Sequence, residues 1–164
     1  MGKINIVRID DRLIHGQVMT KWSKGLGTNA IYVIDNETAS DDFMKDIYIN
    51  TNSSSGLKID VLSTDEVVEK WQQDQFGNDN VILLFKNITA VKSVLDKDVL
   101  PVEKLNVGGI SKKPDATFVI PSVGLNQADA EKLKEIEAKG IEVYFQTVPD
   151  SKKVSLDDAI KAIK

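Results

Sequence analysis

The sequence contains no cysteine, only one histidine and only two arginines among its 164 residues. The absence of cysteine excludes disulfides, thiol catalysis and thiolate metal sites. A formal net charge of −4 gives no broad positive field, so we do not expect nucleic-acid binding. Long apolar runs are also missing: Val81–Phe85 is far shorter than the roughly 20 residues of a spanning helix. We therefore expect no direct insertion into a membrane.

What the chain does contain is enough apolar sequence for one substantial core. Hydrophobic residues make up 41% of it, and a chain of this length normally forms one domain. No internal repeat or linker is evident, because the polar segment 51–56 is too short to divide domains. We expect a single domain over residues 1–164.

Short β-rich runs alternate with longer segments of helical period. Strands are predicted at Lys3–Ile9, Ala30–Asp35, Lys58–Leu62, Asn80–Lys86, Lys104–Val107, Thr117–Ile120 and Ile141–Phe145. Helices are predicted at Gly16–Lys24, Ser40–Asn50, Thr64–Gln73, Thr89–Asp96, Gln127–Lys139 and Leu156–Ile163. This alternation predicts an α/β fold, a three-layer α/β/α sandwich around a mostly parallel six- or seven-stranded sheet.

Ligands of such sheets bind at the loops that follow the carboxyl ends of the strands. The loops after Ile9, Asp35 and Lys86 are therefore the first places to search. Several helices have recognisable starts, since Ser63 and Ser155 are each followed three residues later by an acidic residue.

The loop after the first predicted strand concentrates the rarest residues of the chain. Both arginines, Arg8 and Arg12, lie within seven residues of the only histidine, His15. Arginine offers a fork of donors that matches phosphate oxygens, and a helix N-terminus adds unpaired N–H groups. Neutral histidine is a nitrogen nucleophile near pH 7. The loop predicts a phosphohistidine site, with the backbone of Gly16 and Gln17 facing the phosphoryl oxygens.

Other residues near this loop have two interpretations each. Asp10 and Asp11 could orient the imidazole or hold an arginine, or be ordinary turn carboxylates. Because two carboxylates would repel an anion, at least one should be paired or point away. Asp35 could support the site or cap the next turn, and Lys86 could add positive charge or be solvated. An exposed docking patch or core packing is possible for four residues: Val18, Met19, Trp22 and Leu26.

Two other functions compete with a phosphoryl carrier. Histidine phosphatases and mutases also place a nucleophilic histidine before a glycine, but they have arginine before it and a second histidine. Here Ile14 precedes His15 and no other histidine exists. A non-catalytic anion or nucleotide sensor would use Arg8 and Arg12 without needing the histidine. The sequence contains no nucleotide-binding motif, since no Walker loop is present and Gly25-Leu26-Gly27 follows a predicted helix, not a strand.

The segment Arg8–Val18, RIDDRLIHGQV, resembles the signature around the phosphorylated histidine of IIB subunits in the mannose, fructose and sorbose family of bacterial phosphotransferase systems (PTS). Residues 35–41, 106–109 and 146–149 resemble an acidic loop, a glycine turn and a final strand exit of that family. Asn36 departs from it, because the family usually has a second aspartate there. The resemblance spans the chain.

This resemblance implies a PTS IIB domain that acts as a protein-N(π)-phosphohistidine–sugar phosphotransferase. His15 would accept a phosphoryl group on Nδ1 from the phosphohistidine of a IIA protein or domain and deliver it to sugar held by the membrane IIC and IID subunits. Such a transfer requires no metal and no organic cofactor. The implied location is cytoplasmic, in peripheral association with the membrane permease. The identity of the sugar is not predicted.

Overall fold

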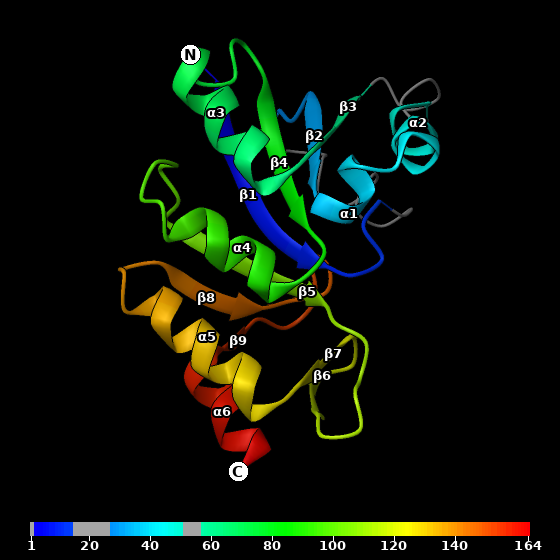
Figure 1. Ribbon diagram of the computed structural model, residues 1–164. Helices are drawn as coiled ribbons and strands as arrows, with labels where there is room; N and C mark the ends of the chain where they lie inside the picture. The colour runs from blue at the N-terminus through cyan, green and yellow to red at the C-terminus, as the bar shows by residue number, and fades with distance from the viewer. Residues whose placement is uncertain (1, 15–26, 51–56) are drawn as a thin grey trace.

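The computed structural model describes residues 2–14, 27–50 and 57–164. Seven strands form one sheet in the order β3-β2-β4-β1-β5-β8-β9, which Figure 1 shows as a twisted layer running through the molecule. Neighbouring strands are parallel, except that β9 is antiparallel to β8. The strands are β1 (Lys3–Asp10), β2 (Ala30–Ile34), β3 (Lys58–Leu62), β4 (Asn80–Phe85), β5 (Lys104–Gly109), β8 (Glu142–Phe145) and β9 (Val154–Ser155). The prediction of a mostly parallel α/β sheet is confirmed.

The central strands are uninterrupted apolar runs because both of their faces are buried. In β4, Val81, Leu83 and Phe85 belong to one core, whereas Ile82 and Leu84 belong to a second core on the opposite face. Side chains of a strand alternate between faces, so one sequence run serves both cores.

Helices cover both faces of this sheet. The first core includes side chains of α3 (Thr64–Asp74), α4 (Ile88–Leu95), α5 (Gln127–Glu137) and α6 (Leu156–Ile163), which Figure 1 shows one after another along the sheet. Residues of α1 (Asn36–Ala39) and α2 (Asp42–Asn50) pack against the second core. The predicted three-layer arrangement is therefore confirmed.

Local hydrogen bonds explain where the helices begin. Ser63 and Glu66 form a complete capping box at the start of α3, and the Ser155 side chain accepts from the Asp158 amide at the start of α6. The predicted helix Ser40–Asn50 is α2, and the separate one-turn helix α1, capped by Asp35, precedes it. α2 begins where the Asp41 carboxylate accepts hydrogen bonds from the amides of residues 43 and 44.

Two predicted elements differ from, or lie outside, the described structure. The predicted strand Thr117–Ile120 is β6, but it pairs with β7 (Val123–Leu125) in a separate two-stranded antiparallel sheet. The seventh strand of the main sheet is instead the two-residue β9, which is too short to show a period of two in the sequence. The predicted helix Gly16–Lys24 lies outside the described residues.

Candidate functional site

The first strand ends in a tight turn that leads to His15. The carbonyl oxygen of Asp10 accepts a hydrogen bond from the Leu13 amide at 2.9 Å. Leu13 has a left-handed φ of 57°, which costs about 1–2 kcal/mol for a residue with a side chain. Its side chain is 2% exposed and packs in the second core, which offsets this cost and anchors the turn. His15, Gly16 and Gln17 lie outside the described residues, so their roles stay predictions.

Arg8 lies beneath this turn with its side chain fully buried. Its Nη1 donates to Asn106 Oδ1 at 2.6 Å and to the Gln146 carbonyl at 3.2 Å. Its Nη2 donates to the Thr147 carbonyl at 2.9 Å and to Asp10 Oδ2 at 3.1 Å. Burial lowers the pKa of Arg8, and the adjacent Asp10 carboxylate opposes that shift. The predicted contact between Arg8 and a phosphoryl group stays a prediction, and it would require these internal bonds to be released.

Asp10 is also buried, and its carboxylate joins the two arginines. Its Oδ1 accepts from the Arg12 amide and from Arg12 Nε, each at 3.1 Å. Its Oδ2 accepts from Arg12 Nη2 at 3.1 Å, in addition to the bond from Arg8. The Arg12 side chain is 48% exposed, so Arg12 presents a fixed guanidinium at the surface, three residues before His15.

Two glycines of β5 leave room for these buried charges. A Cβ atom added to Gly108 would lie 2.0 Å from Cζ of Arg8, and one added to Gly109 would lie 2.5 Å from Oδ1 of Asp10. Both distances are far inside van der Waals contact. The glycine pair is therefore required for the ion pair beneath the turn.

The other predicted supporting carboxylates have structural partners. Oδ2 of Asp11 accepts a hydrogen bond from the Ser111 amide at 2.7 Å. Oδ2 of Asp35 accepts from the amide of Thr38 at 3.1 Å and from its hydroxyl at 2.7 Å. Asp35 is thus the N-cap of α1, which fits the capping interpretation, and Asp11 fixes the loop after β5 to the turn after β1.

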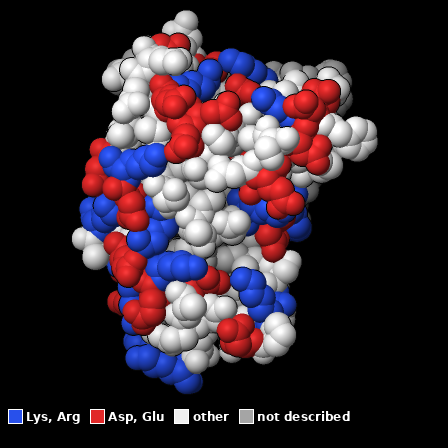
Figure 2. Space-filling model, viewed as in Figure 1, with Lys and Arg blue, Asp and Glu red and all other residues white. Residues whose placement is uncertain are grey.

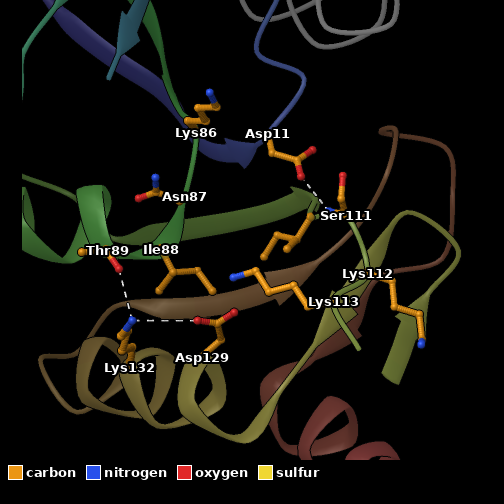
Figure 3. A pocket seen from close by; sticks show the side chains of 11 residues that line it. Asp11, Lys86, Asn87, Ile88, Thr89, Ser111, Lys112, Lys113, Asp129 and Lys132 are labelled. Atoms are coloured by element: carbon orange, nitrogen blue, oxygen red, sulfur yellow. Dashed lines mark hydrogen bonds and ion pairs between the residues drawn. The ribbon is translucent and has the colours of Figure 1, made fainter. Parts of the chain in front are cut away.

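A cleft of about 310 Å³ opens beside this turn, at the carboxyl ends of β4 and β5. We call it the lysine cleft. Its lining residues are Asp11, Lys86, Asn87, Ile88, Thr89, Ile110, Ser111, Lys112, Lys113, Asp129 and Lys132. Figure 3 shows Lys113 extended toward the Ile88 side of the cleft, whereas Lys112 is directed away. A smaller cavity of about 170 Å³ shares Asp11 and Lys86 with it and extends to α1 and α2.

The lysine cleft has an excess of positive charge. It contains four lysines and two aspartates, on a chain whose net charge is −4. Lys132 is engaged by Thr89 and Asp129, but no described residue forms an ion pair with Lys86 or Lys113. Elsewhere lysines such as Lys97 are paired, and Figure 2 shows both signs of charge interspersed over the face that it views.

Sequence reasoning missed the residues that surround the arginines from below. Asn106, Gly108 and Gly109 belong to one segment of family resemblance, and Gln146 and Thr147 belong to another, but neither segment suggested a role. Four of these residues act through a backbone carbonyl or through a missing side chain. Only the proximity of β1, β5 and the exit of β8 reveals the arrangement.

The described part of the chain contains no group of three or more His, Cys, Asp or Glu side chains that could hold a metal ion. It also contains no helix that is both long and apolar enough to span a membrane.

Comparison with known proteins places these features in a family. Residues 4–164 match the family model described as "PTS system sorbose subfamily IIB component". The chain is 31% identical over 160 residues to the mannose-specific EIIAB component of Escherichia coli, which covers 98% of this chain and 49% of that protein. The chain thus spans about half the length of this relative.

Relatives of similar length also match. The sorbose-specific EIIB component of Lacticaseibacillus casei is 30% identical over 145 residues, covering 88% of this chain and 87% of that protein. The crystal structure of manxB from Thermoanaerobacter tengcongensis superposes with a TM-score of 0.89 at 42% identity, covering 98% of this chain and 96% of that one.

Proposed function

Because the chain belongs to the sorbose subfamily of PTS IIB components, we propose that it carries a phosphoryl group on His15. The donor is the phosphohistidine of a IIA protein or domain, and the acceptor is a sugar bound by membrane IIC and IID subunits. The observation that carries the proposal is the exposed Arg12 guanidinium, held on the turn that leads to His15. The activity is that of a protein-N(π)-phosphohistidine–sugar phosphotransferase.

The chemistry asks for positioning and charge more than for covalent work by other groups. Nδ1 of His15 attacks phosphorus as the bond to the donor imidazole breaks in line, and negative charge spreads over three equatorial oxygens. Arg12 is suited to those oxygens because its planar fork matches them. Gly16 and Gln17 would add backbone N–H donors. In the second transfer, the bond from His15 to phosphorus breaks as a sugar hydroxyl attacks.

We place the docking surface for IIA over the turn and the lysine cleft. The cleft shares Asp11 with the turn, so a partner that docks on this turn also faces Lys86 and Lys113. No described residue forms an ion pair with their ammonium groups, which favour a partner with an acidic contact surface. The proposed location is the cytoplasm, in peripheral association with the permease, with residues 1–164 acting as one IIB domain.

A phosphorylation assay tests the proposal directly. Incubation with phosphoenolpyruvate, the general PTS proteins and the matching IIA should add one acid-labile, base-stable phosphate per chain. Since His15 is the only histidine, a phosphohistidine signal in the ³¹P NMR spectrum assigns the site without mapping. The purified phosphoprotein should return its label to unphosphorylated IIA, because transfer between two phosphohistidines is nearly balanced.

The control is His15→Ala, which should take up no label while remaining folded. Equal labelling of this variant would contradict the proposal, as would a stable serine or aspartate phosphate. Rapid spontaneous release of phosphate from the isolated chain would instead indicate a phosphatase.

A further inference from the structure

We propose that Asp10 is a positioning residue, which holds the Arg12 guanidinium ready for the phosphoryl group on His15. In this arrangement Arg8, Gly108 and Gly109 fix Asp10 from below. The inference rests on the proposed function for its kinetic consequence, but the arrangement of side chains can be tested without any phosphoryl transfer.

The hydrogen bonds between Asp10 and Arg12 leave one terminal nitrogen of the guanidinium available to a ligand. Oδ1 and Oδ2 accept from Nε and Nη2, respectively, which is a side-on pair along one edge of the guanidinium. The remaining terminal nitrogen, Nη1, has no hydrogen-bond partner among residues 2–14, 27–50 and 57–164. An arginine whose long side chain is fixed in this way loses less conformational freedom when it binds an anion. Asp10 thus preorganises Arg12 rather than neutralising it.

The buried Arg8 removes the electrostatic objection to a carboxylate at an anion site. Asp10 lies between two guanidinium groups, so the three side chains together carry a formal charge of +1. Without Arg8, the pair of Asp10 and Arg12 would be neutral. A positive site on the turn that leads to His15 therefore needs both arginines, although only Arg12 of the two is exposed.

The bonds of Asp10 support its role in positioning Arg12. Four donors from the two arginines approach Asp10: the Arg12 amide, Nε and Nη2, and Nη2 of Arg8. The carboxylate also packs closely against Gly109 of β5, where there is no space for a methyl group.

The small number of arginines makes an NMR test simple. The chain has two, so the side-chain ¹H–¹⁵N spectrum contains two Nε–H signals, and Arg12→Lys assigns them. In the unphosphorylated chain, Asp10→Asn should make the Arg12 Nε–H exchange with water at least about tenfold faster, because a charge-assisted bond is lost. Transfer from phosphorylated IIA should slow about tenfold in the same variant.

A double-mutant cycle separates positioning from general destabilisation. If Asp10 acts through Arg12, Asp10→Asn should slow transfer less than twofold in an Arg12→Lys background. The matched control is Asp79→Asn, which removes another carboxylate with two partners, Tyr32 and Lys58. It should lose stability while leaving the Arg12 signal and the transfer rate unchanged.

Each outcome bears on the proposal. An unchanged Arg12 signal in Asp10→Asn, or independent effects of the two substitutions on the rate, would overturn it. If Asp10→Asn does not fold, Asp10→Glu keeps the charge and should give intermediate exchange and transfer rates; wild-type values in that variant would count against positioning. If Asp10→Asn speeds exchange of the Arg12 Nε–H but His15 of the wild-type chain takes no phosphate, the proposed function fails. The role of Asp10 in holding Arg12 then stands.

Discussion

Two aspartates at opposite ends of the parallel sheet each hold two polar partners. At the carboxyl end, Asp10 binds the two arginines, Arg8 and Arg12. At the amino end, Asp79 precedes β4, accepts from the Tyr32 hydroxyl at 2.5 Å and pairs with Lys58 at 3.0 Å. Both clusters link strands that are far apart in the sequence.

The clusters differ in the charge that remains. The one around Asp79 contains one cation, one anion and a neutral hydroxyl, so it is formally neutral and serves stability. The cluster around Asp10 retains a charge of +1 and presents Arg12 at the surface. The difference shows that a buried ion pair becomes a candidate anion site when it keeps an excess charge at the surface, here on the turn that leads to His15.

The largest effect should come from Gly108→Ala, which breaks the carboxyl-end cluster from beneath. The new methyl group would occupy the position of the Arg8 guanidinium, and displacing a buried ion pair costs about 3–5 kcal/mol. The free energy of unfolding, measured in urea, should fall by that amount. Gly140→Ala is the control, because its added methyl has nothing within 4 Å and only a φ of 92° to strain it. A smaller loss for Gly108 than for Gly140 would refute the packing argument.

Arg12→Lys should separate function from stability at the same end. It keeps the charge but loses the fork that binds both Asp10 and phosphate oxygens. Loss of one charge-assisted contact, about 1.5–3 kcal/mol, corresponds to transfer about ten- to a hundredfold slower. Stopped-flow transfer from phosphorylated IIA measures it. A rate within twofold of wild type would remove Arg12 from the site.

At the amino end, Tyr32→Phe should affect stability alone. It removes a hydrogen bond to a charged group and should cost about 1.5 kcal/mol at neutral pH, whereas transfer by the folded protein should not change. Tyr144→Phe is the control, since its hydroxyl has no hydrogen bond among the described residues, and it should stay within about 0.5 kcal/mol. Slower transfer by Tyr32→Phe would show that the two ends are coupled.

The same variant has a pH signature. Burial and the hydrogen bond to Asp79 raise the pKa of Tyr32, while in the unfolded chain it ionises near about 10. Above that pH the unfolded chain loses a proton that the native state keeps, so the free energy of unfolding falls by up to about 1.4 kcal/mol per pH unit. Tyr32→Phe should show a correspondingly shallower alkaline decline in urea titrations.

The fold was largely predictable because it depends on hydrophobic periodicity and on residues that cap helices. The apolar run of β4 and the serine that caps α3 can both be recognised in the amino-acid sequence. Neither β9 nor α1 was predicted, because β9 depends on tertiary pairing and the four residues of α1 are too few to show a helical period.

The site was predictable only at positions where the residue type itself indicates a chemical role. Arg8 and Arg12 were both predicted to contact the phosphoryl group because the sequence does not show which of them is buried. Their burial separates them: Arg8 is enclosed and Arg12 is half exposed. That difference arises from Asn106 and the carbonyls after β8, which lie about a hundred residues or more from Arg8 along the chain.

The smallest effect should come from the lysine cleft, which extends the positive charge of the carboxyl end toward a partner. Removing the charges of Lys86 and Lys113 together, by substitution with glutamine, should slow association with phosphorylated IIA about threefold at low salt, because long-range attraction speeds encounter. At about 1 M salt the Debye length is about 3 Å, and the difference should vanish. Surface plasmon resonance over a salt series measures both.

A control with the same change in net charge distinguishes the cleft from the whole-molecule field. Lys97 and Lys134 form surface ion pairs with Asp65 and Glu131, away from the cleft lining, and their double glutamine variant should associate like wild type. Equal slowing of both variants would assign the effect to net charge. No slowing in the cleft variant would confine the recognition of IIA to the turn around Arg12 and His15, and the positive excess of the carboxyl end would then act on the phosphoryl group alone.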